Sequence, residues 1–164
     1  VPGSTAAAVL KGAYVAQHAA AAGGGPALVL IATGSEVEVA VAAAGVVAKD
    51  NATPFSAVRV VSAPCLELFA EQDAAYRASV LPVGSLVVSV EASSVLGWER
   101  YAHHSVGMTT FGESAPTAKL YDFFGFTGAK VAQTSTDFYQ GYKATLAAAG
   151  LAAVPPVVAQ FAPA

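Results

Sequence analysis

The apolar run Leu28-Val29-Leu30-Ile31-Ala32 leads directly into Thr33-Gly34-Ser35-Glu36. Five consecutive apolar residues bounded by turn formers predict a strand that is buried on both of its faces. Ser35 and Glu38 have the spacing of a capping box, so we expect a helix to begin directly after this strand. The helix should end near Lys49-Asp50-Asn51, where its apolar periodicity stops.

The same order of strand and helix recurs along the chain. Val58–Val61 is rich in β-branched residues and predicts a second core strand, and Leu86–Val90 predicts a third. Further helices are expected at Asp73–Val80, Ala115–Phe124 and Thr127–Ala149. Strands that alternate with helices indicate βαβ units, so the predicted fold class is α/β, with a mostly parallel sheet in a three-layer αβα sandwich.

The length of 164 residues indicates one domain. We place this domain at residues 1–150 and a Pro- and Ala-rich, loose tail at residues 151–164. Near the start of the chain a short strand is possible at Ala13–Ala16, and His18–Ala27 is predicted to be an Ala/Gly loop.

Composition and charge exclude several classes of function. The net charge is −3, with Lys and Arg scattered, and this argues against a nucleic-acid partner. Cys65 is the only cysteine, which favours a reducing compartment. Two long uncharged stretches, 12–35 and 144–164, are interrupted by Gly and Pro, so we expect no membrane span. No signal peptide is visible. Separately from this, we expect a protein that is not secreted.

Thr33, Gly34 and Ser35 lie at the turn from a strand into a helix, where free backbone N–H groups can bind an anion. The glycine fingerprint of dinucleotide sites is absent, however, and Glu36 and Glu38 already occupy the positive end of the helix. A plain capped turn is therefore favoured over an anion site.

Gly112-Glu113-Ser114-Ala115-Pro116 is close to the nucleophile elbow of α/β-hydrolases, but Pro116 replaces the final glycine and no histidine follows Ser114. A turn with Ser114 as a helix cap is favoured over a hydrolase. His103 and His104 are adjacent and so would point to opposite faces of a strand, which disfavours a shared metal ion.

Glu91 directly follows the third predicted strand, at the sheet edge where parallel sheets bind their ligands. Trp98 comes soon after, together with Arg100 and Tyr101. Tryptophan, tyrosine and arginine are typical anchors of protein interfaces, so an interface is favoured over a ligand site here.

Several strings in fixed order resemble the C-terminal, third domain of transketolases. They are Leu30–Val37, Val58–Cys65, Val90–Ala92 with Gly97-Trp98, Val106–Pro116 and Phe124–Thr127. The resemblance extends roughly from Pro2 to Ala149. It implies a Rossmann-like domain that packs against the preceding transketolase domains and against a second subunit of a homodimer.

Transketolases transfer a two-carbon ketol unit between sugar phosphates with thiamine diphosphate and Mg²⁺ or Ca²⁺, in the pentose phosphate pathway or the Calvin cycle. The family's Gly-Asp-Gly metal motif is absent from this sequence, and the catalytic residues belong to the earlier domains. The resemblance therefore implies no catalytic, cofactor or metal residue in this chain, which alone should be inactive.

Two roles remain open for the third domain: a module for assembly, or a regulatory module that binds a small anion or a nucleotide. Candidate positions for a regulatory or interface site are Thr33, Gly34, Ser35, Glu91, Trp98 and His103. The resemblance also implies a location in the chloroplast stroma or the cytoplasm.

Overall fold

The computed structural model of the protein describes residues 5–157. Its centre is a five-stranded sheet in the order β1-β3-β2-β4-β5. The strands are β1 (Tyr14–Ala20), β2 (Leu28–Ala32), β3 (Ala57–Ser62), β4 (Leu86–Ser94) and β5 (His104–Met108). Only β1 is antiparallel to its neighbour, and the remaining pairs are parallel, which confirms the mostly parallel sheet.

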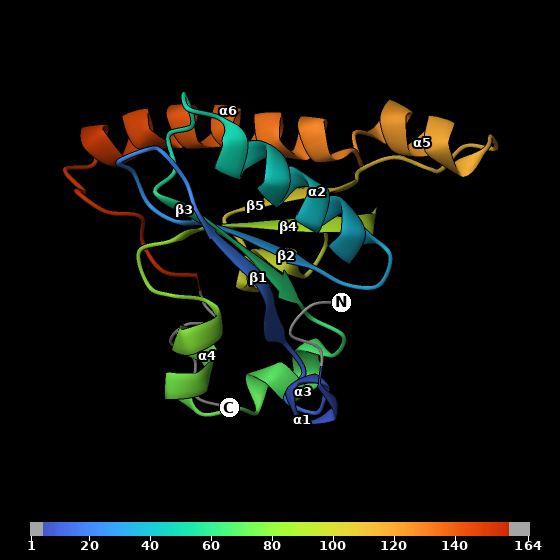
Figure 1. Ribbon diagram of the computed structural model, residues 1–164, viewed down its shortest axis with the longest axis horizontal. Coiled ribbons are helices and arrows are strands. Elements are labelled where there is room, and N and C mark those ends of the chain that lie inside the picture. The colour runs from blue at the N-terminus through green and yellow to red at the C-terminus, as the bar shows by residue number, and fades with distance from the viewer. Residues whose placement is uncertain (1–4, 158–164) are drawn as a thin grey trace.

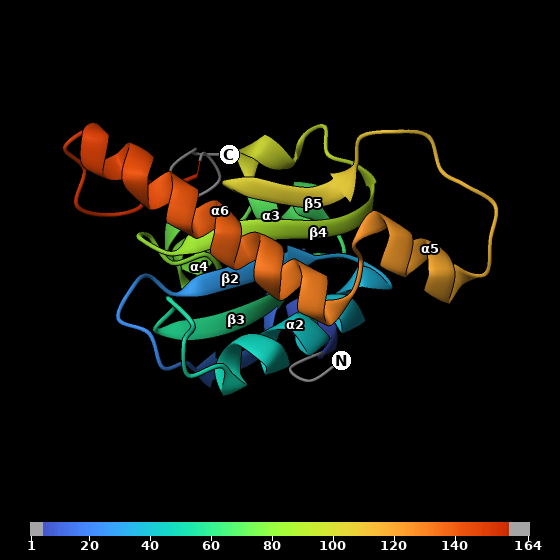
Figure 2. The same ribbon diagram turned by 90° about the horizontal axis from the view of Figure 1, so that it is seen from above.

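Helices cover both faces of the sheet and complete the predicted three-layer sandwich (Figure 1). One face carries α2 (Glu36–Lys49) and α6 (Gly128–Ala148), which also contact each other. The other face carries α3 (Leu66–Ala70), α4 (Ala74–Val80) and the 3₁₀ turn η1 (Trp98–Arg100). The short helix α1 (Ala6–Val9) precedes β1. Helix α5 (Thr117–Phe124) extends beyond the carboxyl ends of β4 and β5 (Figure 2).

Strand β2 joins the two halves of the core because all five of its residues are buried. Leu28 and Leu30 pack on the side of α2 and α6, whereas Val29 and Ile31 pack on the opposite side. The continuous apolar run in the sequence is thus the consequence of a strand with helices on both faces.

Four residues were predicted to cap helices, and two of these caps are confirmed. Asp73 accepts a hydrogen bond from the Tyr76 N–H (2.7 Å), and the Thr127 hydroxyl accepts one from the Lys130 N–H (3.4 Å). The capping box at Ser35 is wrong. Ser35 has helical dihedrals (φ −67°, ψ −28°) instead of the extended ones of a capping residue, and its hydroxyl donates to the Glu36 Oε1 atom. The cap at Ser114 is also wrong, since Pro116 occupies the capping position of α5 and no side chain caps that helix.

The sequence did not predict the full extent of the two edge strands, β1 and β5. The predicted loop from His18 onward is wrong, since β1 continues to Ala20 and pairs with β3. Strand β5 was not predicted at all. An edge strand is less buried than β2, so both strands contain polar residues and only short apolar runs. The apolar pattern by which a strand is recognised in a sequence is therefore weak there.

Helix α6 ends where Gly150 adopts a positive φ of 70°, as the glycine at this position indicates. The following segment is less loose than predicted, since Val154 and Val157 are each only 5% exposed. The boundary between domain and tail at residue 150 stays a prediction, and residues 158–164 lie outside the described part of the chain.

Within residues 5–157, no helix combines the length and the apolar character needed to cross a bilayer.

Candidate functional site

Thr33 and Glu91 lie close to the same edge of the sheet, on neighbouring segments of the chain. Thr33 follows β2, whereas Glu91 lies inside β4, which continues to Ser94, so the strand end expected before Glu91 is wrong. Ala32 is paired with Val90 in the parallel β2–β4 ladder, and each candidate residue directly follows one partner of that pair. The turn Thr33–Ser35 contains Gly34 at a φ of 55°, a left-handed conformation that suits glycine, and it leads into α2. This carboxyl edge is where parallel sheets commonly bind ligands.

The central group at this edge is the carboxylate of Glu36, the first residue of α2, which is only 4% exposed. Its Oε1 atom accepts hydrogen bonds from the Ser35 hydroxyl (2.9 Å) and from the Tyr121 hydroxyl of α5 (2.5 Å). The bond to Glu36 stabilises the protonated phenol and raises the pKa of Tyr121. Tyr121 thereby ties α5 to the start of α2.

Glu91 adds a second carboxylate to the same edge. Its Oε2 atom is buried without a hydrogen-bond partner among the described residues. Burial, and to a lesser extent the negative charge of Glu36, raise the pKa of the Glu91 carboxyl. Two carboxylates at the positive end of α2 make this edge unfavourable for a phosphate or another anion.

Trp98 does not belong to this group. It lies in η1, is only 6% exposed, and packs in the core on the α3 and α4 side of the sheet. Its ring meets Tyr101 edge-to-face at 6.4 Å. The expectation of an interface anchor is therefore not supported for Trp98 or Tyr101, because both rings are used inside the domain.

His103 lies at the opposite end of the sheet from Glu91, just before β5. Its Nδ1 accepts a hydrogen bond from the Val87 N–H (2.9 Å), so the proton is on Nε2, which donates to the Pro155 carbonyl oxygen (2.7 Å). Burial lowers the pKa of His103. These contacts describe a neutral histidine that fastens the chain after α6 to the sheet.

The other chemical candidates remain isolated. Among residues 5–157 no three His, Cys, Asp or Glu side chains are grouped to hold a metal ion, and His104 stacks on Phe138 with ring centroids 4.5 Å apart. Ser114 is exposed between β5 and α5, and it hydrogen-bonds to none of the described histidines. The part of the chain that the structure describes thus offers neither a metal centre nor a catalytic triad.

The contact between Glu36 and Tyr121 was missed in the sequence. The two residues are 85 positions apart, and no local motif connects them. Glu36 was recognised only as an acidic residue at the start of a helix. The apolar neighbours of Tyr121 in α5 indicate a helix but say nothing about where its hydroxyl points.

Comparisons with known proteins agree on one family. A family model described as the transketolase-like TK C-terminal domain matches residues 12–127. A transketolase of Cupriavidus necator is 48% identical over 127 residues, which are 76% of this chain and 18% of that protein. The transketolase structure from Leishmania mexicana has 44% identity and a TM-score of 0.71, and the match covers 82% of this chain and 19% of that one.

The fold extends over nearly the whole chain in a second solved relative. A transketolase structure from Pichia stipitis has 30% identity and a TM-score of 0.79, and it covers 99% of this chain but only 21% of its own. The chain thus spans about a fifth of the length of the relatives that it matches. It belongs to the transketolase family and corresponds to the C-terminal domain.

Proposed function

We propose that this chain is the C-terminal assembly module of a transketolase that transfers a two-carbon ketol unit between sugar phosphates. The observation that carries the proposal is the 48% identity with a segment that makes up only 18% of a transketolase from Cupriavidus necator. One Pichia stipitis structure with the same domain is described as a complex with xylulose-5-phosphate, which is a ketose phosphate. That description supports the substrate class.

The residues of this chain do not fit thiamine diphosphate with its metal ion. The described residues contain no group of three metal-ligating side chains. The carboxyl edge presents Glu36 and Glu91, whose charges would repel a diphosphate. We therefore assign cofactor and Mg²⁺ or Ca²⁺ to the remaining domains of the parent enzyme, and we assign no catalytic step to this chain.

An exposed apolar surface at the carboxyl ends of β4 and β5 supports the role in assembly. Leu96 is 85% exposed and Phe111 is 96% exposed, and both line an open hollow of about 750 Å³ together with Val95 and Met108. Large apolar side chains in such a group commonly mark a surface that contacts a partner. In our proposal the partners are the preceding transketolase domains and the second subunit of a homodimer.

The alternative, a regulatory module that binds a small anion or a nucleotide at the strand ends, is not favoured. The acidic pair at that edge opposes it, and the glycine fingerprint is absent. For the compartment we propose the chloroplast stroma or the cytoplasm. Fractionation of source cells, followed by detection of the native protein, would test this.

The experiment compares the 164-residue chain with a full-length transketolase that contains it. Both are assayed with ribose-5-phosphate and xylulose-5-phosphate in the presence of thiamine diphosphate and Mg²⁺. We expect ketol transfer by the full-length protein alone. Ketol transfer by the short chain would overturn the assignment as an assembly module, and inactivity of both proteins would overturn the proposed activity.

A further inference from the structure

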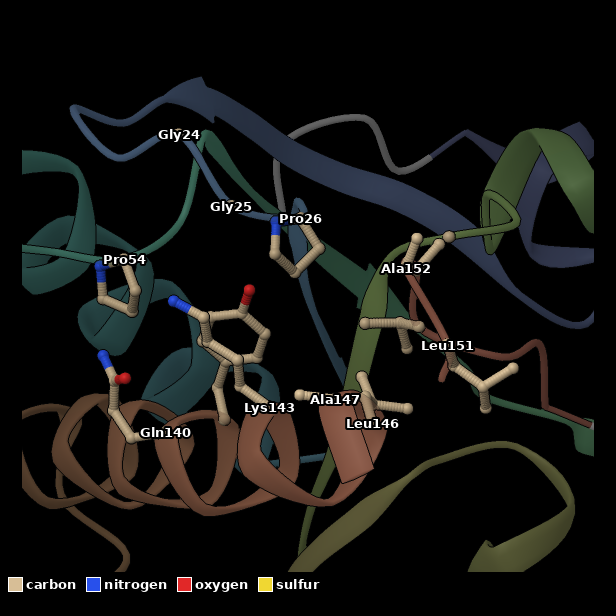
Figure 3. A pocket seen from close by; sticks show the side chains of 14 residues that line it. Gly24, Gly25, Pro26, Pro54, Gln140, Lys143, Leu146, Ala147, Leu151 and Ala152 are labelled. Atoms are coloured by element: carbon tan, nitrogen blue, oxygen red, sulfur yellow. The ribbon is translucent and has the colours of Figure 1, made fainter. Parts of the chain in front are cut away.

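An open cavity of about 690 Å³ lies at the amino-terminal end of the sheet, opposite the acidic edge. Its walls come from residues 24–26 before β2, from residues 139–147 of α6 and from residues 151–154 after α6. Figure 3 shows Gln140 and Lys143 on α6 on one side of this space, with Pro54 and Pro26 on the other. The volume is within the range of about 300–1,000 Å³ that is usual for small-molecule sites.

Three polar side chains of α6 line the cavity and make no hydrogen bond or ion pair within the described part of the chain: Tyr139, Gln140 and Lys143. The ring of Tyr139 is fixed against Phe55, with centroids 5.5 Å apart. Its hydroxyl group hydrogen-bonds to no other described residue, and a Cβ atom at Gly25 would lie 3.0 Å from it. Glycine at position 25 thus allows the loop to pass close to this hydroxyl group, which a larger residue would crowd.

The charge of the cavity favours an anion. Lys143 is the only charged residue among the fourteen that line it. Two carbonyl groups at the end of α6 already have hydrogen-bond donors. The carbonyl oxygen of Leu146 accepts from the Leu151 N–H (2.9 Å), and that of Ala147 accepts from the Gly150 N–H (3.1 Å). These bonds reduce the negative potential that the end of a helix would otherwise present.

The lining further restricts the type of anion. A phosphate group is typically held by several backbone N–H groups or by more than one cation. Here the N–H groups of Gly23 and Gly25 are engaged by the carbonyl oxygens of Phe55 (2.8 Å) and Pro54 (2.9 Å). Much of the remaining wall is apolar, with Leu146 and Val154 among its residues.

We propose that this cavity binds a small amphipathic monocarboxylate. Lys143 pairs with the carboxylate, the hydroxyl of Tyr139 and the amide of Gln140 donate hydrogen bonds to it, and the apolar body of the ligand packs against Leu146 and Val154. The cavity shares no lining residue with the surface proposed for assembly. Carboxylate binding can therefore be tested independently of the transketolase activity.

The test uses the 164-residue chain, with benzoate and hexanoate as probes. A ¹H–¹⁵N NMR titration follows the amide signals of Gly24, Gly25 and Ala147. We expect saturable shifts at these amides with either carboxylate, and weaker binding of inorganic phosphate and of benzyl alcohol. Lys143→Gln should weaken binding of the carboxylates about tenfold, as expected for loss of a charge-assisted hydrogen bond.

Matched variants distinguish the cavity from general surface effects. Ala147→Phe should fill the cavity and abolish binding, whereas Ala148→Phe, one residue further along the same helix, should not. Lys119→Gln removes a lysine outside the cavity and should leave the affinity unchanged. Absence of saturable shifts, equal affinity in Lys143→Gln, or binding of phosphate or benzyl alcohol as tight as that of benzoate would overturn the proposal.

Discussion

His103 donates a hydrogen bond from Nε2 to the carbonyl oxygen of Pro155, 52 residues further along the chain. The other ring nitrogen accepts from the Val87 N–H, so both contacts together require the neutral ring. Protonation would place a second N–H against the Val87 N–H. The segment after α6, which carries the buried Val154, is thus held by a histidine that must stay neutral, and burial lowers the pKa of this histidine.

We predict that the chain loses stability as the pH falls below about 6.5. The pKa of His103 is lowered by burial from its ordinary value of 6.5, and that of His104 is lowered for the same reason. The unfolded chain therefore binds more protons between the folded and the unfolded pKa, so the free energy of unfolding decreases with falling pH in that window. Urea denaturation between pH 5 and pH 8 measures this slope.

His103→Gln should make the pH slope shallower, because one titrating group is gone. At pH 7.5 it should lower the free energy of unfolding by about 1 kcal/mol, since the Val87 N–H loses its acceptor. His18→Gln is the matched control, because His18 is exposed on β1. An equal change of slope in both variants would contradict the role of His103.

Glu91→Gln should stabilise the chain at pH 7. The Glu91 carboxyl has a raised pKa through burial and the nearby Glu36 charge, so its ionised form is disfavoured in the folded state. The folded chain then binds more protons than the unfolded chain just above the ordinary pKa of 4.5, and stability decreases as the pH rises through this window. Thermal melts should show a higher Tm for the variant at pH 7 and little difference at pH 4.

The sequence was sufficient for the central strands and the sheet type because their signals are local. The five consecutive apolar residues from Leu28 to Ala32 predict a buried strand, and the structure has one there. Asp73 is recognisable as a helix cap because it stands directly before a helical segment. The edge strands β1 and β5 have no such run. Their pairing depends on neighbours far away in the chain, such as Val58 for Ala19.

The candidate sites were less predictable, because they depend on side chains from distant elements. The sequence placed Thr33 and Glu91 near strand ends, which follows from strand order alone. It did not indicate that Tyr121 reaches Glu36, or that Tyr139 and Lys143 face a glycine loop. For Trp98 the residue type was misleading. Tryptophan is common at protein interfaces, but this side chain is buried in the core of the domain.

Gly128→Ala should destabilise the packing of α6 on α2. A Cβ atom at Gly128 would lie 2.8 Å from the Cβ atom of Ala42 and 2.9 Å from its backbone carbon, so the two helices must move apart. Overpacking of this kind costs about 1–3 kcal/mol. Chemical denaturation monitored by circular dichroism gives the change in the free energy of unfolding.

Gly141→Ala is the matched control in the same helix. Apart from the adjacent backbone of α6 itself, no described atom lies within 4 Å of a Cβ atom at Gly141, so the substitution adds helix propensity without a clash. It should stabilise the chain by about 0.5–1 kcal/mol. If both alanine variants shift stability in the same direction, the close approach of α2 and α6 at Gly128 is not the deciding contact.

Replacing Leu96 and Phe111 together by serine should reduce association without lowering stability. Both side chains are largely exposed, so their loss should change the free energy of unfolding by less than about 0.5 kcal/mol. In sedimentation velocity the isolated chain should self-associate less, and a full-length enzyme should dissociate into subunits more readily. Val83→Ser removes an apolar side chain that is 59% exposed near the opposite end of the sheet, before β4. Equal effects of both changes would show that general surface hydrophobicity, rather than the surface around Phe111, drives association.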